Sequence, residues 1–238
     1  MNDDPIIILH GWNLSSLHYL PLIRELNSRS HEVLCPDLPG FGINKILKKS
    51  LTLTDYADFV EVYLKEKKIK QAVIIGHSFG GRIALRLAAT SPESIQKLIL
   101  SGVPGFSPVA TIKTEFYKFI AKSGKNLLKI TGLSRYENYF RFNLYKSIPS
   151  SDYTKTAQEL KETFKKIINE SLLADMTQIK IPVLLIWGRE DRIVPVKIAE
   201  KMKNLISGSE LDIVPDARHS LPYSHPREFA DKIDNFIN

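Results

Sequence analysis

Residues 72–89 read Ala-Val-Ile-Ile-Gly-His-Ser-Phe-Gly-Gly-Arg-Ile-Ala-Leu-Arg-Leu-Ala-Ala. The first four are apolar and mostly β-branched, which predicts a short buried strand, and the apolar spacing from Arg82 onward predicts an amphipathic helix. A Gly-x-Ser-x-Gly motif centred on Ser78 joins the two. Glycine is needed at Gly76 and Gly80, because so tight a turn leaves no room for a Cβ. The stretch therefore predicts a nucleophile elbow that presents the Ser78 hydroxyl beside the open amides of a helix N-terminus.

Strands and helices alternate along both halves of the chain. Apolar runs predict strands at residues 5–9, 32–35, 72–75, 97–101, 182–188 and 210–214. Helical patterns stand between them, beginning at Pro21, at Thr54 as an N-cap, near Pro195 and at Pro226. This alternation is typical of a parallel α/β sheet.

The alternation stops between residues 104 and 178. This stretch lacks β runs and shows helical spacing, for example at Leu160, Phe164, Ile167 and Ile168. Its twelve Lys and Arg residues outnumber its seven acidic residues, so it carries +5 of the formal net charge of +7. We expect residues 1–103 and 179–238 to form the core, and residues 104–178 to form a helical cap, or lid, inserted into it.

The composition, 43% hydrophobic and 25% charged, is that of a soluble globular protein. One cysteine, Cys35, allows no internal disulfide and fits a reducing compartment. No apolar run is long enough for a membrane span, and the N-terminus is acidic, so we expect a cytoplasmic protein. Lysines alternate with glutamates at helical spacings, which favours a solvated surface over a nucleic-acid partner. The sequence shows no metal-ligand spacing, and we predict neither a metal nor a cofactor.

Ligands of a parallel sheet bind beyond the carboxyl ends of its strands, so the residues that follow each strand are informative. Five such exits stand out: His10-Gly11-Trp12, Ser78, Gly102, Gly188-Arg189-Glu190-Asp191 and Asp216-Ala217-Arg218-His219. A serine nucleophile needs an imidazole base, and the base needs an acid that fixes its tautomer. His219 can be that base and Asp191 that acid, in the chain order found on this architecture. The alternative is a solvent-exposed loop histidine and an unrelated turn aspartate.

Taken together, these motifs resemble the α/β-hydrolase superfamily, in particular its small single-chain branch of esterases, carbon–carbon bond hydrolases and related lyases. The matching stretches span nearly the whole chain, at residues 9–12, 36–42, 76–81, 185–191, 194–195, 219–220 and 225–226. The resemblance implies a catalytic triad of Ser78, His219 and Asp191. It also implies an oxyanion hole formed by the amides of Trp12 and Phe79. Four further residues are expected around the substrate: His10, Gly11, His77 and Arg82.

The chain departs from the family pattern in three places. Members usually begin with an antiparallel hairpin, but only four residues precede the first predicted strand here, so we expect a mainly parallel sheet of about six strands. The loop after Gly42 lacks the serine that is common there. Arg218 stands where a small residue usually precedes the histidine.

The leading hypothesis is a serine hydrolase, a monomer or homodimer, that cleaves a small carboxylic ester or related acyl compound through an acyl-enzyme. The serine argues against the dehalogenase and epoxide-hydrolase branches, which use aspartate. One alternative is a carbon–carbon bond hydrolase, or a lyase of the menaquinone-biosynthesis type, in which Arg82 resembles a residue that binds a substrate carboxylate. The simpler interpretation of Arg82, which the sequence favours, is a surface residue of the elbow helix. Another alternative is a ligand receptor on a retained hydrolase scaffold.

Overall fold

The computed structural model describes residues 4–45, 47–106 and 150–238, in which six strands form one sheet. The strands are β1 (Ile6–Leu9), β2 (Val33–Leu34), β3 (Ala72–His77), β4 (Ile95–Ser101), β5 (Val183–Gly188) and β6 (Glu210–Val214). Their order across the sheet is β2-β1-β3-β4-β5-β6, and every neighbouring pair is parallel. The predicted parallel sheet of about six strands is confirmed.

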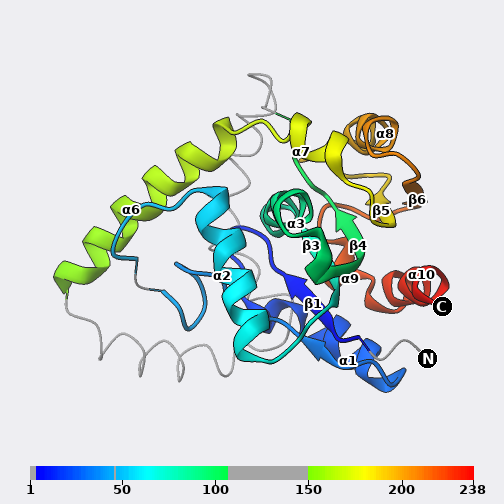
Figure 1. The fold of residues 1–238 in the computed structure, drawn as a ribbon, viewed down its shortest axis with the longest axis horizontal. Helices are drawn as coiled ribbons and strands as arrows, with labels where there is room; N and C mark the ends of the chain where they lie inside the picture. Colours follow the sequence, from blue (N-terminus) through cyan, green and yellow to red (C-terminus); the bar gives the residue numbers. More distant parts are fainter. Residues whose placement is uncertain (1–3, 46, 107–149) are drawn as a thin grey trace.

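Each face of the sheet has its own hydrophobic core, because successive side chains of a strand point to opposite faces. Ile7 and Leu9 of β1 join one core, and Ile6 and Ile8 join the other. The first core is covered by α2 (Leu53–Glu66), α3 (Phe79–Thr90) and α8 (Val196–Leu205), and the second by α1 (Leu20–Ser28) and α10 (Pro226–Ile237) (Figure 1). Burial on both faces explains why β1 is an unbroken apolar run.

The remaining described helices are short or lie in the predicted cap. Three are single turns, namely η1 (Ser16–Tyr19), η2 (Pro92–Ser94) and α9 (Leu221–Ser224). The other two, α6 (Ser150–Asn169) and α7 (Leu173–Gln178), lie between β4 and β5 within residues 104–178. Residues 107–149 of the predicted cap lie outside the described residues, so the division into core and cap stays a prediction.

Helix α2 corrects one detail of the sequence interpretation, because its N-cap is Thr52 rather than Thr54. The Thr52 hydroxyl accepts the Asp55 amide, and the Asp55 carboxylate accepts the Thr52 amide in return. This reciprocal capping box needs an acceptor side chain three residues after the cap. Thr54 is followed at that spacing by Ala57, which has no acceptor.

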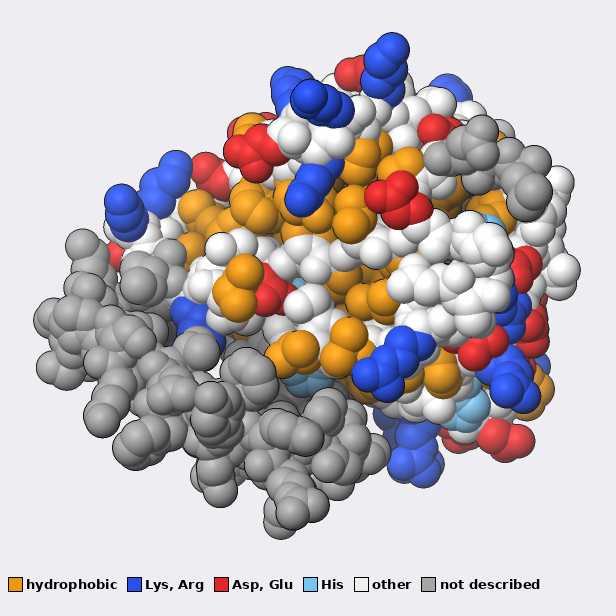
Figure 2. All heavy atoms as spheres, turned by 90° about the horizontal axis from the view of Figure 1, so that it is seen from below, with side chains coloured by type: hydrophobic (Ala, Val, Ile, Leu, Met, Phe, Trp, Pro, Cys, Tyr) orange, Lys and Arg blue, Asp and Glu red, His pale blue; other side chains and the backbone are white. Residues whose placement is uncertain are grey.

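The described surface mixes both signs of charge. Figure 2 shows hydrophobic side chains gathered toward the middle of one face, with lysine and arginine side chains interspersed with acidic ones around them. In the part of the chain that the structure describes, no helix has the length and apolar character needed to cross a membrane.

Candidate active site

Ser78 lies in a strained turn between β3 and α3. Its φ of 53° and ψ of −112° place it where a residue with a side chain is rarely found. A Cβ on Gly80 would lie 2.0 Å from the Leu9 carbonyl oxygen, and one on Gly76 would lie 2.5 Å from the Gly81 Cα. Only glycine therefore fits on either side of Ser78, and the predicted strand, turn and helix are all present.

His219 and Asp191 meet at the same edge of the sheet. The Nδ1 atom of His219 lies 2.8 Å from Oδ2 of Asp191, and both side chains are buried. The other oxygen, Oδ1, accepts the amides of Ile193 and Val194, each at 2.8 Å. An ionised carboxylate accepts but does not donate, so Nδ1 carries the hydrogen, and the lone pair of a neutral ring is on Nε2.

Gly102 shows how closely this pair approaches the elbow. The Ser78 amide donates to the Ser101 carbonyl oxygen at 2.9 Å, so the elbow is joined to the end of β4. The next residue, Gly102, has a φ of 60°, and a Cβ there would lie 2.8 Å from Nδ1 and Cε1 of His219. The exits of β3, β4, β5 and β6 therefore converge, and a glycine makes room for the imidazole.

His77 is held by hydrogen bonds at both ring nitrogens. Its Nε2 lies 2.8 Å from the His219 carbonyl oxygen, which can only accept, so Nε2 donates and Nδ1 is the acceptor. The Tyr19 hydroxyl donates to Nδ1 at 2.6 Å and accepts the Gly11 amide at 3.0 Å. Burial lowers the pKa of the His77 imidazole to about 3, which keeps the ring neutral. This chain of bonds links the backbone of the loop after β1 to that of the loop after β6.

His10, which follows β1, is likewise held by hydrogen bonds at both of its ring nitrogens. Its Nε2 accepts the Leu38 amide at 2.9 Å, which leaves the hydrogen on Nδ1 for the Gly11 carbonyl oxygen, also at 2.9 Å. Burial lowers the pKa of His10 to about 4. The loop after β2 is further held by the Asp37 carboxylate, which accepts the amides of Ser16 and Ile43 at 2.7 and 2.9 Å.

The two residues predicted to form the oxyanion hole pack together through their rings. The ring centroids of Trp12 and Phe79 lie 5.1 Å apart in an edge-to-face arrangement. Phe41 and Phe164 also contact Trp12, at centroid distances of 4.9 and 5.0 Å. The Phe79 backbone opens α3, where amides lack partners within the helix. Interlocked rings therefore fix the segments that carry both amides.

Arg82 is buried, with 3% of its surface exposed, so its interpretation as a surface residue of the elbow helix is wrong. Its guanidinium donates to the carbonyl oxygens of Pro104, Ile167 and Glu170, the last two at 2.7 and 2.6 Å. Burial lowers the pKa of Arg82 to about 10. The predicted contact of Arg82 with substrate stays a prediction. Arg218, the residue that departs from the family pattern beside His219, is exposed.

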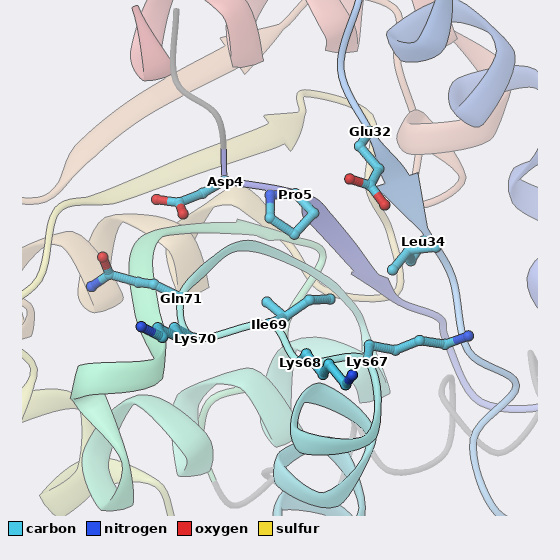
Figure 3. A pocket seen from close by; sticks show the side chains of 9 residues that line it. All are labelled: Asp4, Pro5, Glu32, Leu34, Lys67, Lys68, Ile69, Lys70 and Gln71. Atoms are coloured by element: carbon cyan, nitrogen blue, oxygen red, sulfur yellow. The ribbon is translucent and has the colours of Figure 1, made fainter.

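Two structural features of this edge were not predicted from the sequence. Tyr19 connects Gly11 to His77, yet it lies in the single turn η1, where no periodicity or motif draws attention to it. Phe164 stands out in the sequence only as part of a helical pattern. A separate pocket of about 440 Å³ lies at the opposite, amino end of the strands and is lined by residues 4–5, 32, 34 and 67–71 (Figure 3).

The fold and this site define a class, in which a parallel sheet carries a serine elbow beside a buried His–Asp pair. A sequence profile described as alpha/beta hydrolase fold matches residues 4–226, and the chain belongs to this family. The resemblance noted from the motifs is thereby confirmed, and the chain is an α/β-hydrolase enzyme.

Similar proteins include two esterases of known name. The pimeloyl-[acyl-carrier protein] methyl ester esterases of Wigglesworthia glossinidia brevipalpis and Shewanella woodyi are 30% and 27% identical, each over 98% of this chain and 93% of the relative. Among solved structures, MGS-M2, an alpha/beta hydrolase enzyme from a Medee basin deep-sea metagenome library, matches with a TM-score of 0.77. It is 24% identical, and the match covers 100% of this chain and 90% of that one.

Proposed function

We propose that this protein is a serine esterase in which Ser78, His219 and Asp191 act as nucleophile, general base and orienting acid. The observation that carries the proposal is the buried 2.8 Å bond from His219 Nδ1 to Asp191, at the sheet edge where the Ser78 elbow ends. That bond fixes the tautomer in which Nε2 can accept a proton from a serine hydroxyl. The esterase names of the relatives support the same class of reaction.

The reaction follows from these roles. His219 Nε2 takes the Ser78 proton while the Ser78 oxygen attacks the ester carbonyl carbon, and the carbonyl oxygen becomes an oxyanion. The amides of Trp12 and Phe79 donate to that oxyanion. Collapse breaks the bond to the alcohol oxygen, which leaves with the proton from His219. Water then attacks the acyl-enzyme carbonyl carbon as His219 takes its proton. The bond to the Ser78 oxygen breaks, His219 returns the proton to that oxygen, and the carboxylic acid is released.

We propose the ester of a linear acyl chain as the first substrate class to test. Two relatives are named for the methyl ester of a pimeloyl chain. The rings of Trp12, Phe41, Phe79 and Phe164 form a buried apolar cluster at the elbow, and apolar surroundings favour hydrocarbon over polar acyl groups.

Labelling with a fluorophosphonate tests the nucleophile. Wild-type protein is expected to react with one equivalent, and Ser78→Ala with none, because no other serine among the described residues combines the elbow with the His219–Asp191 pair. Ser101→Ala is the control, since Ser101 is equally buried and ends the neighbouring strand. Labelling that persists in Ser78→Ala would contradict the assignment.

Steady-state assays then test the reaction class. A panel of methyl and p-nitrophenyl esters with short and long acyl chains is expected to give repeated turnover. One burst of product equal to the enzyme concentration, followed by almost no turnover, would point to a ligand receptor instead. Labelling of Ser78 without cleavage of any ester would point to the carbon–carbon hydrolase or lyase alternatives.

A further inference from the structure

Helix α3 carries two arginines that lie one helical turn apart. Arg82 and Arg86 are four residues apart, so they lie on one face of the helix. Arg82 donates to the carbonyl oxygens of Ile167, in the last turn of α6, and of Glu170, just after α6. Arg86 lies 3.4 Å from the Glu170 carboxylate and 3.1 Å from the carboxylate of Asp175 in α7. The elbow helix and the end of α6 are therefore joined by charged groups.

The positive charge of Arg82 also lies at the C-terminal end of α6, where it is electrostatically favourable. The last carbonyl groups of a helix lack partners within it and carry partial negative charge, so a cation there is favourable. The guanidinium occupies this place at the C-terminal end of α6, which is Asn169. A buried guanidinium without acceptors is strongly unfavourable, and these backbone carbonyls satisfy much of its hydrogen bonding.

Arg82 also donates to a third acceptor, the Pro104 carbonyl oxygen, which lies at the start of the connection between β4 and β5. Pro104 follows β4, and Ile167 and Glu170 lie at the far end of the same connection. One side chain of the elbow helix thus fixes the chain both where it leaves β4 and where it returns toward β5. Its planar fork of donors suits several fixed carbonyls, whereas a lysine ammonium has a different geometry.

Helix α6 in turn contacts the predicted oxyanion loop. The ring of Phe164 lies 5.0 Å from that of Trp12, and the Thr163 hydroxyl accepts the Leu51 amide at 2.8 Å. Phe164 is 7% exposed and precedes the Ile167 carbonyl held by Arg82 by less than one helical turn. A displacement of the C-terminal end of α6 would therefore move the Phe164 ring relative to Trp12.

We infer that Arg82 is a positioning residue that holds α6 and its Phe164 ring against Trp12, and thereby sets the acyl-chain selectivity of the site. The inference rests on the proposed esterase function. It gives Arg82 a role through protein contacts rather than through a substrate carboxylate.

The test compares Arg82→Gln and Arg82→Lys with a matched control, Arg29→Gln. Arg29 also joins two helices through several contacts, to Glu25, Asp231 and Asp234, but it does so between α1 and α10. The first readout is the ratio of kcat/KM for short and long p-nitrophenyl esters, with enzyme concentration taken from fluorophosphonate titration. The second is acrylamide quenching of tryptophan fluorescence, which does not depend on activity.

Arg82→Gln is expected to change the selectivity ratio by about tenfold, the size of effect that a small change in a hydrophobic pocket produces. It should also make one of the two tryptophans accessible to acrylamide, because Trp12 loses its cover while Trp187 stays buried at 0% exposure. Arg82→Lys should fall between wild type and Arg82→Gln, and Arg29→Gln should change neither readout. If Arg82→Gln fails to fold, Arg82→Lys and Phe164→Ala are measured, and both should shift the ratio in the same direction.

An unchanged ratio with unchanged quenching in fully titrated enzyme would overturn the inference. A loss of kcat/KM confined to carboxylate-bearing substrates, without a change in quenching, would also overturn the inference. It would indicate that Arg82 binds the substrate directly. Wild-type protein that fluorophosphonate does not label would contradict the proposed function, and the quenching experiment would still decide whether Arg82 places α6.

Discussion

Among single residues, two adjacent carboxylates are candidates for the acid that orients His219. Glu190 and Asp191 both follow β5, and either could be expected to reach the histidine. Asp191 is buried, and its carboxylate accepts hydrogen bonds from His219 and from the amides of Ile193 and Val194. Glu190 is exposed. Neighbouring residues of a loop point in different directions, and here only Asp191 points toward the imidazole.

Exchange of each carboxylate for its amide tests this difference. Asp191→Asn keeps the shape but favours the wrong imidazole tautomer, and we expect kcat to fall by up to about 10⁴-fold, as in serine proteases. Glu190→Gln removes only a charge screened by solvent, and we expect less than about a tenfold change. Steady-state kinetics on one ester gives both values. A larger loss in Glu190→Gln would mean that the acid is misassigned.

At the scale of elements, β1 is an interior strand despite its position near the N-terminus. It lies between β2 and β3, and its four residues are 0–1% exposed. We expect deletion of residues 1–9 to unfold the protein, because four large apolar side chains contribute about 1.5–3 kcal/mol each when buried. Deletion of residues 1–3 is the control and should leave a cooperative urea transition. A cooperative transition in the longer deletion would show that the sheet does not depend on β1.

The sequence was sufficient for most elements because their signals are local. Apolar runs and helical spacing depend on neighbouring residues, and the Ser78 turn follows from glycines within two residues of it. The contacts of Tyr19 and Arg82 are different in kind. Tyr19 bonds His77, which is 58 residues away, and Arg82 bonds carbonyl groups 85 and 88 residues away. The partners of Arg82 are backbone carbonyl groups, which every residue carries, so no sequence pattern identifies them.

At the scale of the whole molecule, buried histidines couple folding to pH. Burial is the largest cause that lowers the pKa of His77 to about 3 and of His10 to about 4. Ordinary histidine, as in the unfolded chain, has a pKa near 6.5. Below pH 6.5 the unfolded chain therefore binds more protons at these two positions than the folded protein does. Stability must then fall as the pH falls from about 7 toward 4.

This linkage predicts a steep acid dependence of the free energy of unfolding. Between pH 7 and pH 5 each of the two rings should remove about 2 kcal/mol, since one pKa unit corresponds to about 1.36 kcal/mol. Urea unfolding at a series of pH values measures the slope. His77→Gln removes one titrating ring, so it should lower stability at pH 7, where the bonds to Tyr19 and His219 are lost, yet flatten the slope. Part of the slope should remain, because burial also lowers the pKa of His10 and of His18. Asp55 does not contribute to the slope in this pH range. Its bonds to Thr52 lower its pKa to about 2, so the stability it contributes is lost only as the pH falls through 4 toward 2.

Two outcomes would contradict the prediction: a free energy of unfolding that is level between pH 7 and pH 5, or a slope that His77→Gln leaves unchanged. Either would mean that the fold does not keep His77 neutral, and that the hydrogen bonds assigned to its two nitrogens need another protonation state.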